Sequence, residues 1–146
     1  MTKTKELQEE IVENMRHWQK IESGSVAMTG TIMSKTDSPV IKLIMEIIQH
    51  DSKMHHRIQQ LIIDSLQKES ISLTPEELGK VWDLIEQHIK MEEETVRLAK
   101  ESKDALKGRK MMVQEYLLDY LIMDEEKHDK TLETLATIKK GMYPYG

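Results

Sequence analysis

The sequence contains no cysteine and no phenylalanine, and only 4% of its 146 residues are aromatic. Without cysteine the protein cannot form disulfides, zinc–thiolate sites or iron–sulfur clusters, and it has no thiol nucleophile. Histidine, aspartate and glutamate are therefore the strong metal ligands that the chain can offer. The low aromatic content, together with only six glycines and three prolines, favours helices over sheets. We expect an all-α protein.

Charge of one sign is not concentrated anywhere along the chain. The net charge of −5 is carried by interspersed acids and bases, so the basic stripe of a nucleic-acid-binding surface is missing. The sequence has no uncharged apolar run of membrane-spanning length, and its first ten residues lack the apolar segment of a secretion signal. We expect a cytoplasmic protein with no nucleic-acid partner and no membrane partner. Its expected partners are a metal ion and further copies of the chain.

Helical periodicity and helix-boundary residues divide the chain into four long segments. Ser38 and Thr74 are expected to cap helices that begin at the prolines following them, and Gly108 is expected to end a helix in the left-handed conformation. These signals predict helices over about residues 4–34, 39–68, 75–106 and 109–140. Short breaks after the first and third helices predict two hairpins, packed as one four-helix bundle in a single domain over residues 1–146.

The segments HDSKMHH and MDEEKHD resemble two copies of one motif. When His55 is aligned with His128, Ser52 falls on Glu125, which is the carboxylate of a Glu-x-x-His pattern. The second copy is therefore intact, and the first copy lacks its carboxylate.

Glutamate and histidine side chains fall at matching levels of the predicted second hairpin, which turns near Gly108. Glu92 before the turn and Glu125 after it are almost equally far from this glycine along the chain. His88 and His128 are equally far from it on the two sides. Residues three or four apart on a helix share a face. We therefore expect the four side chains to converge, either as a metal site or as a buried network of ion pairs.

The predicted first hairpin, which turns near Asp37, offers fewer ligands. Glu22 before the turn and Asp51 after it are almost equally far from Asp37 along the chain, and His55 lies one helical turn beyond Asp51. Glu22, Asp51 and His55 all project from apolar stripes, where a charge without a partner is costly to bury. A metal ion is one partner that would satisfy them.

A glutamate on each of two helices, with Glu-x-x-His on each of the other two, is the ligand set of ferritin-like di-metal bundles. Over about residues 5–140 the sequence resembles that superfamily, with KIESGSVA similar to its first-helix glutamate segment and DEEKHD similar to its fourth-helix motif. The resemblance to rubrerythrin-type and small uncharacterised ferritin-like proteins is closer than that to the cage ferritins. Carried over to this chain, it implies the following metal ligands: Glu22, His55, Glu92, Glu125 and His128.

The resemblance also implies a metal and a reaction class. The implied metal is iron, in a di-iron centre, with manganese or zinc as alternatives, and the implied chemistry is that of a rubrerythrin or ferroxidase acting on oxygen or peroxide. Ser52 stands where such sites have a bridging carboxylate, so either Asp51 or His88 compensates, or the site holds one ion or none. The alternative function is a non-catalytic, oligomeric bundle with a metal-free polar core. A hemerythrin-like oxygen carrier would need a His-x-x-x-His pair, which the six histidines do not form.

Overall fold

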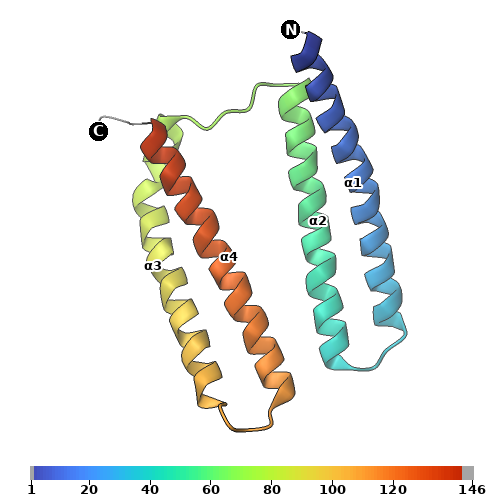
Figure 1. Ribbon diagram of the computed structural model, residues 1–146, viewed down its shortest axis with the longest axis vertical. Coiled ribbons are helices and arrows are strands. Elements are labelled where there is room, and N and C mark those ends of the chain that lie inside the picture. The colour runs from blue at the N-terminus through green and yellow to red at the C-terminus, as the bar shows by residue number, and fades with distance from the viewer. Residues whose placement is uncertain (1, 143–146) are drawn as a thin grey trace. The chain divides into compact units, whose positions relative to one another are not determined.

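The computed structural model describes residues 2–142, and this part of the chain contains helices and no strand. Its four α-helices are α1 (Thr2–Ser34), α2 (Pro39–Gln67), α3 (Pro75–Ala105) and α4 (Met112–Met142) (Figure 1). The predicted all-α class is confirmed. None of the helices within residues 2–142 has an apolar stretch sufficient to cross a bilayer.

Local sequence signals account for the helix boundaries. Ser38 and Thr74 each cap a helix, because their hydroxyls accept a hydrogen bond from the amide three residues later, at 3.3 and 3.2 Å. Gly108 adopts a φ of +78°, the left-handed conformation that side chains with a Cβ adopt only at a cost. The turn around Gly108 extends to residue 111, so α4 begins at Met112 and not at the predicted position 109.

The chain divides into two compact units, Met1–Ile71 and Ser72–Gly146. In the first unit α1 packs along α2, and in the second unit α3 packs along α4; each pair is joined by a tight turn (Figure 1). The two predicted helix hairpins are confirmed. The single domain over residues 1–146 stays a prediction.

Both hairpins bury polar side chains along with apolar ones. The buried apolar residues include Val12 and Ile63 in the first hairpin and Leu78 in the second. The buried polar residues are Glu22, Thr29, Ser52, Gln59 and Glu92. A buried polar group destabilises a protein unless it has a partner, and a buried carboxylate does so most strongly. The surroundings of the two buried glutamates therefore decide what each hairpin can bind.

Candidate metal centre

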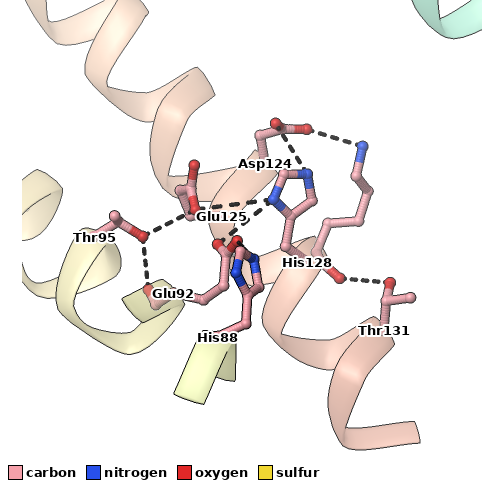
Figure 2. Close-up of polar contacts among 8 residues, drawn as sticks. His88, Glu92, Thr95, Asp124, Glu125, His128 and Thr131 are labelled. Carbon is pink, nitrogen blue, oxygen red and sulfur yellow. Dashed lines mark hydrogen bonds and ion pairs between the residues drawn. The ribbon is translucent and has the colours of Figure 1, made fainter. Parts of the chain in front are cut away.

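The second hairpin brings Glu92, Glu125 and His128 together between α3 and α4 (Figure 2). One ligand atom from each residue lies within 4.8 Å of the other two. Glu92 is only 8% exposed, whereas Glu125 and His128 are half-buried. The predicted convergence of these three side chains is confirmed.

His128 presents its Nδ1 atom to both carboxylates. This atom lies 3.5 Å from Glu92 Oε2 and 3.9 Å from Glu125 Oε2. On the other side of the ring, Nε2 lies 3.5 Å from Asp124 Oδ2. Both ring nitrogens therefore face acidic side chains. When Asp124 accepts the Nε2 proton, the lone pair of Nδ1 faces the two carboxylates, which is the form that a metal ion requires.

The two carboxylates also have outer partners that fix their orientation (Figure 2). His88 Nε2 lies 2.8 Å from Glu92 Oε1, and the Thr95 hydroxyl donates a hydrogen bond to Glu125 Oε2 at 2.9 Å. Outer partners of this kind hold metal-binding side chains in place and tune their affinity. Both carboxylates are thus held in defined orientations.

Two of these outer partners bear on the sequence-based interpretation. His88 was predicted as a ligand, but it contacts one oxygen of Glu92 and does not join the group of three converging ligand atoms. Thr95 was not predicted as a residue of the site. Its position three residues after Glu92, on the same helical face, was the signal that could have identified it.

The other oxygen of Glu92, Oε2, lacks a hydrogen bond. It is buried and forms no hydrogen bond within residues 2–142, although His128 Nδ1 lies 3.5 Å away. A buried carboxylate oxygen in this situation raises the free energy of the folded state unless a proton, a water or a cation satisfies it. Because its neighbours are a second carboxylate and an imidazole nitrogen, a cation fits this position.

The protonation of the two carboxylates is linked. The pKa of Glu125 is raised, first by the hydrogen bond that its protonated form makes with Glu92 and then by burial. The pKa of Glu92 is lowered, first by that same hydrogen bond and then, against the cost of burial, by His88 and His128. Glu125 therefore holds its proton more strongly than an ordinary glutamate does, and a metal ion would compete with that proton.

The first hairpin brings together two of its three predicted ligands. Glu22 is 7% exposed, and its Oε1 lies 3.3 Å from His55 Nδ1. Trp18 Nε1 donates a hydrogen bond to the same oxygen at 3.1 Å. Ser52 is 5% exposed, and its hydroxyl donates to the hydroxyl of Ser25 at 2.9 Å. No second carboxylate joins Glu22 and His55 in the described part of this hairpin.

The third predicted ligand, Asp51, forms no hydrogen bond or ion pair with any residue that the structure describes. Counting residues from the turn at Asp37 placed Asp51 opposite Glu22. In the structure, His55 contacts Glu22 instead. The same offset of three or four residues occurs in the second hairpin, where Glu92 meets His128. Side chains lean towards the N-terminus of their own helix, so those before a turn lean away from it and those after it lean towards it. Counting equal distances from the turn was therefore wrong by about one helical turn.

Comparison of the sequence with protein-family models gave no match. Comparisons with curated proteins and with solved structures gave no match either. The resemblance to the ferritin-like superfamily therefore stays a prediction from the sequence.

Proposed function

We propose that the α3–α4 hairpin binds one divalent metal ion through Glu92, Glu125 and His128. The observation that carries this proposal is the buried Oε2 of Glu92, which receives no hydrogen bond from residues 2–142 and lies beside an imidazole nitrogen and a second carboxylate. A cation at this point would satisfy that oxygen and remove the repulsion between the two carboxylates.

Iron(II), manganese(II) and zinc(II) suit this ligand set. It offers carboxylate oxygens and an imidazole nitrogen and contains no sulfur donor. Three protein ligands leave further coordination positions for water or substrate, as in catalytic sites and unlike closed structural sites. When bound, iron or manganese would supply one-electron chemistry with oxygen or peroxide, in keeping with a ferritin-like, rubrerythrin-type protein.

The outer partners would preorganise the ligands before the ion arrives. His88 occupies Oε1 of Glu92 and leaves Oε2 for the ion. Thr95 restrains Glu125, and Asp124 lies beside Nε2 of the imidazole so that Nδ1 faces the site. Because these side chains are already oriented, less conformational entropy is lost when the ion binds.

The first hairpin by itself offers only two ligands, Glu22 and His55. Ser52 holds the third position with a hydroxyl that is already engaged with Ser25. A neutral hydroxyl is a weaker ligand than a carboxylate for these ions. We therefore propose the metal ion for α3–α4 and consider Glu22 and His55 the remaining part of a second, incomplete ligand set.

Calorimetric titration of the chelator-treated full chain with Mn(II) tests this proposal. We expect one ion per chain, and we expect Glu125→Gln to weaken binding by at least about 100-fold, since even the loss of an outer partner costs about 10- to 100-fold. The matched control is Glu126→Gln, which makes the same charge change at the next residue, where the carboxylate pairs with Lys100 at 3.1 Å. The control should bind manganese as the wild type does.

A metal-free polar network is the second candidate, and the hydrogen bonds of the cluster favour it. Glu92 Oε1 and Glu125 Oε2 already have protein partners, and a proton shared between the carboxylates would satisfy the remaining oxygen of Glu92. Under this alternative, protein produced in iron- and manganese-supplemented medium contains no bound metal. The calorimetric titration would then show no saturable binding for the wild type or for either variant.

A further inference from the structure

Two adjoining grooves run along one face of the α1–α2 hairpin. The larger measures about 410 Å³ and the smaller about 270 Å³, and both are lined by Ser23 and His56. Three cationic side chains, Arg16, Lys20 and Lys53, contribute to their walls, and none of the lining residues is acidic. Lys20 comes from α1 and Lys53 from α2, so the positive charges approach the grooves from both helices.

The charge of these grooves is not compensated within the hairpin. In the groove beside α3 and α4 the lysines are neutralised, for example Lys103 by Asp119 at 2.6 Å. By contrast, Lys20 and Lys53 form no ion pair with any residue in the described part of the chain. In a protein with 26 acidic and 21 basic residues, a groove with cations and no acids has a positive local potential that favours an anion.

The hydroxyl of Ser23 indicates a ligand site independently of the positive charge. Three other hydroxyls of α1, those of Thr29, Thr31 and Ser34, donate to backbone carbonyls three or four residues earlier. The Ser23 hydroxyl makes no such bond, and it has no other partner among residues 2–142. A helical serine that does not bond to its own backbone has its donor available to a ligand.

His56, Gln19 and Gln60 also line the larger groove. His56 is half-buried, and its ring forms no hydrogen bond or ion pair with a described residue. In the lining of the same groove, the Gln19 amide donates to the His56 carbonyl at 3.3 Å and to Gln60 Oε1 at 3.0 Å. These bonds join α1 to α2 beside the groove.

We propose that these grooves bind the phosphate group of a small molecule between Lys20 and Lys53, with Ser23 and His56 as further donors. A phosphate presents several acceptor oxygens in different directions, which matches donors that come from two helices and have no partner of their own. The larger groove, about 410 Å³, falls within the range of roughly 300–1,000 Å³ that is typical of small-molecule sites. This inference does not depend on the metal proposal, because it uses residues of the first hairpin only.

Nuclear magnetic resonance titration of the full chain with inorganic phosphate tests the inference. We expect saturable shifts at Lys20, Ser23, Lys53 and His56, with a Kd of about 1 mM or tighter, in a buffer of about 20 mM ionic strength, where exposed charges are weakly screened. The double variant Lys20→Gln with Lys53→Gln should weaken binding by at least about tenfold.

The matched control is Lys35→Gln with Lys42→Gln, which makes the same charge change on the same hairpin at exposed positions that do not line the grooves. It should change the Kd by less than about twofold. Ser23→Ala removes a donor without changing the charge, and it should weaken binding by about threefold.

Three results would overturn the inference. One is the absence of saturable shifts at phosphate concentrations up to about 10 mM. Another is an equal loss of binding in the two double variants, which would show diffuse attraction and no defined site. The third is binding to vesicles that contain phosphatidic acid without binding to inorganic phosphate, which would show a charged surface and not a phosphate pocket.

Discussion

The two hairpins make corresponding contacts at corresponding positions, although several of the side chains differ. Residues 70 positions apart correspond between α1 and α3, and residues 73 positions apart correspond between α2 and α4. The corresponding pairs are Glu22 with Glu92, Trp18 with His88, Ser25 with Thr95, Ser52 with Glu125, and His55 with His128. In each hairpin the glutamate contacts the histidine of the partner helix, at 3.3 Å in the first and 3.5 Å in the second.

The contacts around these pairs recur as well. The residue four positions before each glutamate contacts its carboxylate, through Trp18 in one hairpin and His88 in the other. The residue three positions after it bonds across to the next helix at 2.9 Å in both, where it meets Ser52 or Glu125. The same positions of the two hairpins are therefore in contact although several of their side chains differ. The capacity for a third metal ligand depends on the single difference between Ser52 and Glu125.

The largest expected effect comes from making the second hairpin like the first. Glu125→Ser removes the third ligand while Thr95 keeps a hydroxyl partner, as Ser25 has in the first hairpin. We expect the Mn(II) affinity, measured by calorimetry, to fall by at least about 100-fold. Glu133→Ser, at an exposed position of the same helix, should have no effect. An affinity for Glu125→Ser within about threefold of the wild type would break the comparison.

The reverse substitution, Ser52→Glu, should create a second metal site. Position 52 is 5% exposed and corresponds to Glu125 of the second hairpin, so without metal the new carboxylate should destabilise the protein by about 3 kcal/mol. With Mn(II) that loss should be recovered, because the ion compensates the charge. The measurement is the Tm of wild type and variant with and without the ion.

Met54→Glu is the control for this substitution, because Met54 is 49% exposed and a carboxylate there remains solvated. Equal metal responses in Ser52→Glu and the wild type would show that residue 52 does not face Glu22 and His55. The alignment of HDSKMHH with MDEEKHD would then be out of register.

A smaller effect is expected from the aspartates at corresponding positions, Asp124 and Asp51. Asp124 lies beside His128 Nε2, whereas Asp51 has no partner among the described residues. Asp124→Asn should therefore lower the Mn(II) affinity by about tenfold, and Asp51→Asn should leave it unchanged. Equal effects of the two substitutions would mean that Asp124 does not orient the imidazole.

The smallest effect concerns the stability of the metal-free protein. The pKa of Glu125 is raised above its ordinary value of 4.5 by the hydrogen bond with Glu92 and by burial, so the folded state favours the protonated form. As the pH rises from the ordinary value through the raised one, the unfolded state ionises first and the wild type loses stability relative to Glu125→Gln. Urea unfolding of both proteins between about pH 4 and pH 8 measures this difference. A wild type that instead gains stability relative to Glu125→Gln as the pH rises would contradict the assignment.

Much of the fold could be predicted because its signals are local. Ser38, Thr74 and Gly108 each fix a helix end through their own backbone and side-chain chemistry, and the sequence shows them directly. The convergence of Glu92 with Glu125 and His128 was predicted as well. Residues three or four apart share a helical face, so a residue count that is wrong by one helical turn still selects the correct face.

The details of the contacts could not be predicted in the same way. Asp51 was placed opposite Glu22, and His88 opposite His128, because the counts treated side chains as perpendicular to the helix axis. In the structure His55 meets Glu22 and Glu92 meets His128, an offset that follows from the tilt of side chains towards the helix N-terminus. Which partner occupies which oxygen depends on this tilt, and a residue count does not contain it.

The central claim is that Glu92, Glu125 and His128 bind one metal ion, and anomalous scattering from crystals soaked in Mn(II) tests it most directly. We predict one strong peak about 2.1 Å from Glu92 Oε2, from a carboxylate oxygen of Glu125 and from His128 Nδ1, with His88 and Asp124 outside its coordination sphere. The absence of a peak between these side chains, or a peak bound by other residues while Glu92 Oε2 stays without a ligand, would contradict the claim.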